Sequence, residues 1–333
     1  MLGSLAEDAG IRREDVFQVC VVGNTCMHHL FLGISPASLV HAPYTPAVSE
    51  RLVLNAGDYG LAVQERAELI MLSDIAGYVG ADTCGCLLAI RQDQQEEISL
   101  MIDIGTNGEM VLGNRERLVT CSTAAGPAFE GAKIECGMRG AAGAVDHVKY
   151  EDGKWNYTTV GNKPAVGLCG SGLIDLVAGL LDAGMLDENG VLRSGQEKQG
   201  VFILVPPERG GNERGVYLTQ KDLGEVQLAK AAIAAGIQML MERLGITEDD
   251  ICSVYIAGAF GNYMDPVSAG KIGLLSATLV GNTAGEGAKI ALVNEKEMLE
   301  MDELVRKIEF VELAASADFQ DHFIDELGFE TGE

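Results

Sequence analysis

The sequence predicts an α/β fold in which hairpins are inserted into a mixed sheet. Apolar, β-branched runs alternate with segments of helical periodicity along the chain, a pattern typical of parallel strands joined by crossover helices. Hairpin signals interrupt this alternation. An Asp-Gly turn at 152–153 lies between the alternating segments of residues 147–160, and it adds antiparallel strands to the prediction.

The first strand is predicted at 17–23, where an apolar, β-branched run favours a short buried strand. A turn at 23–25 leads into a helix from about 27 to 32. Residues 26–29, Cys-Met-His-His, have the composition of a metal-ligand cluster. Because apolar residues follow them directly, packing and helix-start roles are the preferred interpretation.

A further strand and helix are expected before residue 98. An apolar segment begins at 69–72, and a Gly-x-x-Gly-Ala-Asp turn at 77–82 opens a helix through Leu88. The polar run at 91–97 is the best candidate for a boundary, although a surface loop would have the same composition.

The middle of the chain predicts a strand at 99–105 that enters a Gly-rich turn, with a returning strand at 109–112. Apolar residues on one face predict a helix over 170–181. The stretch 187–215 is rich in Gly, Glu and Arg, and we expect a long surface excursion there.

The clearest helix signal covers 225–244, where apolar residues recur near helical spacing and Gly245 follows at the expected end. A strand at 254–257 comes next and ends in another Gly-rich turn. The tail predicts a strand at 308–313 and a helix at 317–327.

The composition indicates a soluble cytoplasmic protein. Hydrophobic residues make up 47% of the 333 residues and aromatic residues only 5%, so the core must be aliphatic. No apolar run approaches the roughly 20 residues of a membrane-spanning helix, and the N-terminus lacks the order of a signal peptide.

The charge balance restricts the partners. With 24 basic and 49 acidic residues, the net charge is -25. Such a field repels nucleic acid and anionic membrane surfaces, so neither is expected as a partner. An anionic nucleotide would need backbone N–H donors or a metal ion to overcome the general repulsion.

Cysteine spacing argues against a cofactor held by this chain's thiols. None of the eight cysteines forms a Cys-x-x-Cys pair, and Cys84 and Cys86 have no second pair to complete a metal site. The spacings typical of ferredoxins are also absent. We therefore expect neither a disulfide framework nor an iron–sulfur cluster here.

The first Gly-rich turn, at 103–109, is the strongest candidate for binding chemistry. Gly105 and Gly108 allow a ligand to approach the backbone, whose N–H groups bind phosphate oxygens. Thr106 and Asn107 add neutral donors. Asp103 is suited to hold Mg²⁺ directly or through water, with turn capping as the alternative.

Two further turns follow apolar runs. One opens the helix predicted at 170–181, where the helix dipole favours an anion. The other ends the strand at 254–257, where small residues leave room for a base or ribose. Taken singly, each of these turns fits a structural role equally well. Their candidate cofactor-binding residues are Gly170, Ser171 and Gly172 in the first, and Gly258, Ala259, Phe260 and Gly261 in the second.

A fourth segment supplies a second carboxylate. Glu130 follows Gly126-Pro-Ala-Phe, and it is a candidate for positioning a catalytic water or for binding ribose. Gly126 is a candidate cofactor-binding residue in the same turn. A helix-start carboxylate favoured by the helix dipole is the alternative for Glu130.

The order of these loops resembles the actin, sugar-kinase and heat-shock-chaperone ATPase superfamily. Over nearly its whole length, the chain resembles the reductive activators of corrinoid proteins. The strings Asp-Ile-Gly-Thr-Asn-Gly-Glu at 103–109 and Ala-Ala-Gly-Pro-Ala-Phe-Glu-Gly at 124–131 are its most specific matches. The matching segments are 22–30, 80–82, 102–109, 124–132, 137–139, 169–175 and 257–261.

This resemblance implies an ATPase with bound ATP or ADP and Mg²⁺, and Asp103 is the candidate metal ligand. It implies a corrinoid protein as the partner, whose inactive Co(II) is returned to Co(I) at the expense of ATP. It suggests a homodimer. It also implies that residues 1–97 are part of a first lobe and 98–333 a nucleotide-binding second lobe with inserted segments.

The sequence departs from the family pattern in two ways, and these limit which family properties we expect of this chain. The family's ferredoxin-like cysteine spacing is absent, so the iron–sulfur cluster is expected only in an upstream domain that is missing here. Only one Asp-x-Gly-Thr hairpin is present, although the superfamily uses two. We therefore expect a fragment that cannot transfer electrons alone and whose ATP hydrolysis is weak or absent.

Two alternatives remain open. The chain could activate another low-potential enzyme, as the activators of 2-hydroxyacyl-CoA dehydratases do with a similar fold. It could instead be a non-enzymatic docking module for a corrinoid protein, with structural Gly loops. A small-molecule kinase is less attractive, because no residue stands out as a base for a substrate hydroxyl.

Overall fold

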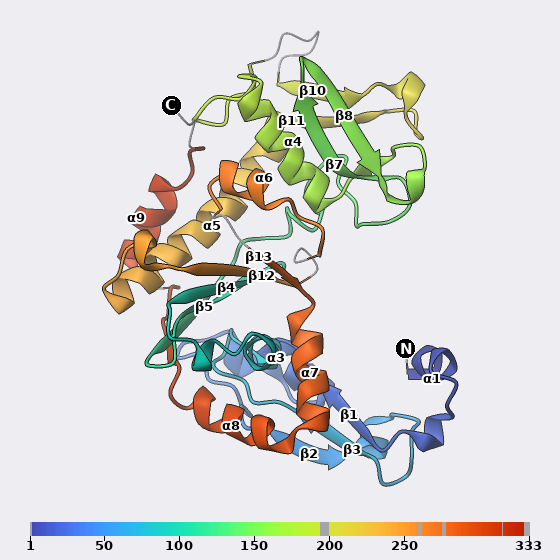
Figure 1. Ribbon diagram of the computed structural model, residues 1–333, viewed down its shortest axis with the longest axis vertical. Coiled ribbons are helices and arrows are strands. Elements are labelled where there is room, and N and C mark those ends of the chain that lie inside the picture. The colour runs from blue at the N-terminus through green and yellow to red at the C-terminus, as the bar shows by residue number, and fades with distance from the viewer. Residues whose placement is uncertain (1, 194–199, 259–261, 275–277, 315, 330–333) are drawn as a thin grey trace. The chain divides into compact units, whose positions relative to one another are not determined.

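The computed structural model describes residues 2–193, 200–258, 262–274, 278–314 and 316–329. The chain divides into two compact units, each made of segments that are not continuous in sequence (Figure 1). The first unit contains the chain up to Glu96 together with 113–121 and 282–310, and the second contains 97–112, 122–281 and the chain from Val311 onward. The assignment of these parts to the two lobes of an actin-like ATPase stays a prediction.

A small sheet with the strand order β1-β3-β2 forms the base of the first unit. Strand β3 is paired with β1 in parallel and with β2 in antiparallel orientation. Leu69 and Met71 of β3 point into a small core with Ala56 and Ala67. The elements of this region are α1 (Leu2–Asp8), β1 (Gln18–Val21), α2 (Thr25–Phe31), β2 (Leu52–Asn55), β3 (Glu68–Met71) and α3 (Ala81–Ile90).

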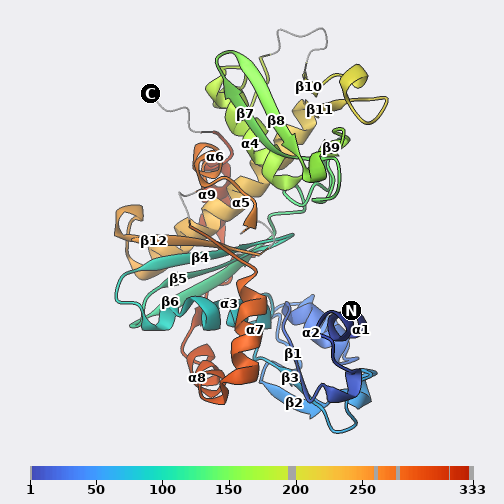
Figure 2. The same ribbon diagram turned by 45° about the vertical axis from the view of Figure 1, so that its right-hand side comes forward.

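The late segment of the chain completes the first unit. Helix α7 (Thr283–Val293) lies side by side with α3 in both views (Figures 1 and 2). Two glycines allow this approach, since a Cβ at Gly287 would stand only 1.8 Å from the carbonyl oxygen of Gly85. Helix α8 (Glu295–Val305) follows, and strand β14 (Glu309–Phe310) pairs parallel with β6 (Leu118–Thr123).

Four strands of the second unit are neighbours in the order β13-β12-β4-β5. Strand β4 lies parallel to β12, which lies parallel to β13. Helix α5 has a largely buried face and is joined by α9 in the same unit. The bounds are β4 (Ser99–Ile104), β5 (Gly108–Gly113), α5 (Gln220–Leu244), β12 (Ser253–Ala257), α6 (Pro266–Lys271), β13 (Thr278–Gly281) and α9 (Ala317–Asp325).

An inserted β-rich region completes the second unit. Helix α4 packs against β7, which pairs antiparallel with β8 (Figure 1). Strand β7 also pairs parallel with β9. Strands β10 and β11 form a separate antiparallel pair. Their bounds are β7 (Ala144–Glu151), β8 (Lys154–Thr159), β9 (Gly167–Leu168), α4 (Gly170–Asp182), β10 (Val201–Val205) and β11 (Val216–Thr219).

The predicted α/β class, the hairpin at 147–160, and the helices at 170–181 and 225–244 are confirmed. The prediction of a buried first strand was wrong, because β1 is half-buried at best and Phe17 beside it is 65% exposed. The stretch 187–215 is not only a surface excursion, since β10 lies within it and pairs with β11. Among the helices that the structure describes, none has the length and apolar character needed to cross a membrane.

Candidate functional site

The carboxyl ends of β4 and β12 lie at one edge of the second unit's sheet. These strands are parallel neighbours, and Asp103 is directly opposite Ala257 in their register. The turn after β4 is tight, because the N–H of Gly105 donates to the carbonyl of Asn107 at 2.9 Å. Parallel strands bring the loops that follow them to the same edge, where ligands of α/β sheets commonly bind.

Gly258 brings the turn after β12 against the Asp103 carboxylate. Its φ is +80°, in the region that favours glycine. A Cβ at this position would stand 2.3 Å from Asp103 Oδ1, closer than any real contact. The backbone angle therefore favours glycine at 258, and a larger residue there would displace the half-buried Asp103 carboxylate.

Glu130 contacts the same turn. The hydroxyl of Thr106 donates to Glu130 Oε1 at 2.6 Å, and the N–H of Gly126 donates to the carbonyl of Thr106 at 2.8 Å. Gly126 also has a φ of +80°, and a Cβ there would meet no atom within 4 Å. The segment around Gly126 and Glu130 thus folds beside the tip of the β4–β5 turn and leaves open space next to it.

Gly108 has a different role in this turn. It is buried, and a Cβ there would stand 3.0 Å from Thr123 Oγ1 and 3.2 Å from Ile233 Cγ1. Its small size lets the β4–β5 turn pack against helix α5. Its predicted contact with a cofactor stays a prediction.

The arrangement suits a magnesium nucleotide. Mg²⁺ prefers oxygen ligands and is often held by one or two carboxylates, with phosphate oxygens and water completing its shell. Asp103 offers such a carboxylate, and the turn after it offers backbone N–H groups. No group of three or more His, Cys, Asp or Glu side chains among the described residues could hold a metal by itself. A metal here would therefore take its remaining ligands from the nucleotide and solvent.

The turn at the start of α4 is explained by packing. Gly170, Ser171 and Gly172 form the first turn of this helix, and all three are buried. The hydroxyl of Ser171 donates to the carbonyl of Asp146 at 2.8 Å, and a Cβ at Gly172 would stand 2.2 Å from the carbonyl oxygen of Val145. Close contact with β7 accounts for Ser171 and Gly172, while the predicted role of all three residues in nucleotide binding stays a prediction.

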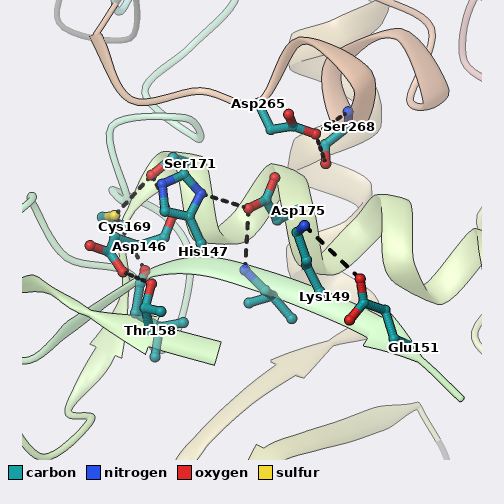
Figure 3. A network of polar contacts seen from close by, with 12 residues as sticks. Asp146, His147, Lys149, Glu151, Thr158, Cys169, Ser171, Asp175, Asp265 and Ser268 are labelled. Carbon is teal, nitrogen blue, oxygen red and sulfur yellow. Dashed lines mark hydrogen bonds and ion pairs between the residues drawn. The ribbon is translucent and has the colours of Figure 1, made fainter. Parts of the chain in front are cut away.

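Next to this turn lies a polar pair, His147 and Asp175, that the sequence analysis did not predict. His147 Nδ1 is 3.1 Å from Asp175 Oδ2, and Figure 3 shows the imidazole pointing toward the carboxylate. Burial raises the pKa of Asp175, although contacts with Ser268, the N–H of Val148 and His147 act in the opposite direction. The available signal was an acidic residue within the apolar helix pattern of 170–181.

The described contacts thus connect Asp103 with Gly258, and Thr106 with Gly126 and Glu130, around one turn. The contacts of Ser171 and Gly172 are with β7. The remaining candidates from the third turn, Ala259, Phe260 and Gly261, lie outside the described residues.

Two family models match consecutive parts of the chain. Residues 1–95 match the RACo middle region, and residues 97–333 match the C-terminal domain of RACo, the ASKHA domain. The chain belongs to the RACo family of reductive activators. The predicted actin-like ATPase fold is thereby confirmed for residues 97–333.

Two proteins that act on corrinoid proteins are similar over most of this chain. The corrinoid activation enzyme RamQ of Eubacterium limosum is 34% identical across 97% of this chain and 58% of its own length. The [Co(II) methylated amine-specific corrinoid protein] reductase of Methanosarcina barkeri is 28% identical across 82% of this chain and 54% of its own.

A solved structure agrees with these matches. A reductive activator for corrinoid, iron-sulfur protein superposes with a TM-score of 0.89 at 37% identity, covering 98% of this chain and 55% of that one. This RACo-family chain therefore spans a little more than half the length of the relatives it matches.

Proposed function

We propose that this chain is the ATP-binding and partner-docking portion of an activator that returns inactive Co(II) corrinoid proteins to Co(I). The observation that carries the proposal is the meeting of Asp103, Gly258 and the Thr106–Glu130 pair at one edge of a RACo-type ASKHA domain. The relatives named for corrinoid activation support the choice of partner. The electron for each cobalt would come from an iron–sulfur domain outside this chain.

Each residue has a defined task in this proposal. Asp103 would hold Mg²⁺, and the backbone N–H groups of the turn at Gly105 would bind phosphate oxygens. Glu130, held by the Thr106 hydroxyl, would orient a water molecule toward the terminal phosphate. When bound, Mg²⁺-ATP supplies the free energy of hydrolysis that the uphill reduction requires.

Nucleotide binding would act on the partner through differential affinity. A ligand shifts a conformational equilibrium only by as much as its affinities for the two states differ. We therefore expect affinity for the Co(II) corrinoid protein to differ between the ATP-bound and nucleotide-free chain. Binding of the corrinoid protein that ignores ATP would instead favour the docking-module alternative.

Calorimetric titration with Mg²⁺-ATP and Mg²⁺-ADP tests the nucleotide site. We expect micromolar affinity that falls at least about tenfold in Asp103→Ala, equivalent to about 1.4 kcal/mol of binding free energy. Asp249→Ala is the matched control, since this exposed aspartate lies in the short 3₁₀ turn Glu248–Asp250. Equal affinity in wild type and Asp103→Ala would overturn the role assigned to Asp103.

A further inference from the structure

A cavity of about 370 Å³ lies at the end of strand β8, in the inserted β-rich region of the second unit. It is lined by residues 157–159 and 162–165 together with Arg209. Its volume is within the range of small-molecule sites, about 300–1,000 Å³. None of the described residues of the β4–β5 turn or around Gly258 lines it. The cavity is therefore built by other residues than the candidate nucleotide site.

The charge of this lining is opposite to that of the chain as a whole. Among the described residues that line the cavity, Lys163 and Arg209 are the only charged ones, whereas the chain has 49 acidic and 24 basic residues. Neither cation forms an ion pair with another described residue. Two acids are close in the chain or by contact. Asp146 accepts from the hydroxyl of Thr158 at 2.6 Å (Figure 3), and Glu208 precedes Arg209, but neither carboxylate lines the cavity. An anion in the cavity would therefore meet positive charge that no described carboxylate pairs with.

Backbone contacts hold the segments of the two cations side by side. The N–H of Gly211 donates to the carbonyl of Ala165 at 2.7 Å, which joins the segment of Arg209 to that of Lys163. A Cβ at Gly211 would stand 2.6 Å from Val166 Cγ1, so the two segments are packed as closely as glycine allows. The backbone positions that carry the two cations are thus fixed relative to each other, although they are distant in the sequence.

Two neutral side chains add hydrogen-bond donors to the lining. The Tyr157 hydroxyl and the Asn162 amide have no hydrogen-bond partner among the described residues. Pro164, Ala165 and the ring of Tyr157 add apolar surface. The lining therefore offers cations and donors to an anionic group, and apolar surface to an organic body attached to it.

We propose that this cavity binds a small organic dianion, either a phosphate monoester or a dicarboxylate. Two cations match two negative charges, and a phosphate monoester carries a charge of about -1.5 to -2 at pH 7. The guanidinium group of Arg209 presents paired N–H donors that fit the oxygens of a phosphate or a carboxylate. The inference is independent of the proposed function, because it requires neither Mg²⁺-ATP nor a corrinoid protein.

Calorimetric titration of the full chain with phenyl phosphate and with phthalate tests the site. For a ligand of this size we expect a dissociation constant on the order of 0.1–1 mM. Lys163→Gln and Arg209→Gln should each weaken binding at least about fivefold, and both variants should fold because these side chains are exposed. Lys154→Gln is the matched control, since it removes the same charge from an exposed position of β8 outside the cavity. Equal affinities in the wild type and the two cavity variants, or a control as damaging as they are, would overturn the proposal.

The choice of probes distinguishes an organic ligand from a bare anion. Inorganic phosphate should bind at least about tenfold more weakly than phenyl phosphate, because it leaves the apolar part of the lining unused. Tighter binding of phenyl phosphate than of phthalate would assign a phosphate ester, and the reverse order a dicarboxylate. Inorganic phosphate that binds as tightly as phenyl phosphate would contradict a site for an organic ligand.

Asn162→Gly tests the neutral donors. Asn162 has a φ of +52°, which glycine adopts freely, so this change removes the amide without straining the turn. We expect it to weaken phenyl phosphate binding about twofold or more with no loss of stability to urea. Unchanged affinity would remove Asn162 from the proposed site.

Competition with nucleotide separates this site from the nucleotide site. Saturating Mg²⁺-ATP, or Asp103→Ala, should change the affinity for phenyl phosphate by less than about twofold. Lys163→Gln should likewise leave the affinity for Mg²⁺-ATP unchanged. Displacement of phenyl phosphate by Mg²⁺-ATP would place the probe in the nucleotide site and would overturn the proposal. A chain that does not bind Mg²⁺-ATP would refute the proposed function alone, because the titrations with phenyl phosphate do not depend on nucleotide.

Discussion

Gly258 is the residue at which backbone and side-chain geometry restrict the candidate site most. Alanine there would have to adopt a φ of +80° and place its Cβ against Asp103 Oδ1. We expect Gly258→Ala to lower the free energy of unfolding by about 2–4 kcal/mol. We also expect it to weaken Mg²⁺-ATP binding at least about tenfold, as measured by calorimetry, because the carboxylate is displaced.

The variant Gly126→Ala separates the cost of the backbone angle from the cost of the contact with Asp103. Gly126 has the same φ of +80°, but a Cβ there would be in open space. Only the backbone cost of about 1 kcal/mol should remain in urea unfolding. If both variants lose the same stability, contact with Asp103 is not the reason for glycine at 258.

The buried carboxyl group of Asp175 should also make the free energy of unfolding depend on pH. Burial raises its pKa above the unfolded value of about 3.9. Its contribution to stability is therefore present below that pH and is lost as the pH rises through the folded pKa. Relative to Asp175→Asn, the wild type should lose unfolding free energy as the pH rises above the unfolded pKa of about 3.9, as measured by urea unfolding at about one-unit pH steps. A difference that instead grows with pH would mean that His147 stabilises the ionised carboxylate more than burial disfavours it.

At the scale of elements, the start of α5 depends on a buried capping box. Asp222 accepts from the N–H and hydroxyl of Thr219, and its other oxygen accepts from the N–H of Glu135. Because Asp222 is fully buried, its removal leaves these donors with no acceptor, and water cannot reach them to replace it. We expect Asp222→Ala to lower the free energy of unfolding by about 3 kcal/mol in urea titrations.

A second capping box provides the control for that prediction. Asp250 forms the same motif with Thr247 in an exposed 3₁₀ turn. Water can replace the lost acceptor there, so Asp250→Ala should cost only about 1 kcal/mol or less. Equal losses in the two variants would show that burial is not what makes the α5 cap important.

At the scale of the whole molecule, the first unit depends on a segment from the last sixth of the chain. Gly287 of α7 packs against Gly85 of α3 with no room for a Cβ. Alanine within a helix normally adds up to about 1 kcal/mol of stability over glycine. We nevertheless expect Gly287→Ala to remove about 2 kcal/mol or more.

Hydrogen exchange can follow that loss unit by unit. Amides of α3 and β3 should lose protection in Gly287→Ala, while those of α5 should keep theirs. Gly224→Ala is the control, because Gly224 of α5 has open space around it and the change should stabilise by about 0.5–1 kcal/mol. Equal loss of protection in α5 would contradict division into two units.

Some elements have no counterpart among those predicted. Helices α7 and α8 were not expected, and the two glycines in the first half of α7 lower its intrinsic helix propensity. The tail strand predicted at 308–313 is reduced to Glu309–Phe310. In both cases the contacts with neighbouring elements decide the conformation rather than the local pattern.

The sequence by itself determined the fold class, the hairpin of β7 and β8, helix α5 and the turn after Asp103. These features depend on periodicity and turn residues within a few positions, so local physical chemistry is sufficient to predict them. The family also followed from strings that are continuous in sequence, such as that at 103–109.

Only the tertiary structure decided which of these features meet. Gly258 lies against Asp103, Asp175 against His147 and Gly287 against Gly85, and none of these pairs is marked by a local pattern. His28 of α2 likewise contacts Asp74, which is 46 residues away along the chain. Such contacts depend on how strands are ordered and helices packed, and residues distant in the chain become neighbours only when the whole unit folds.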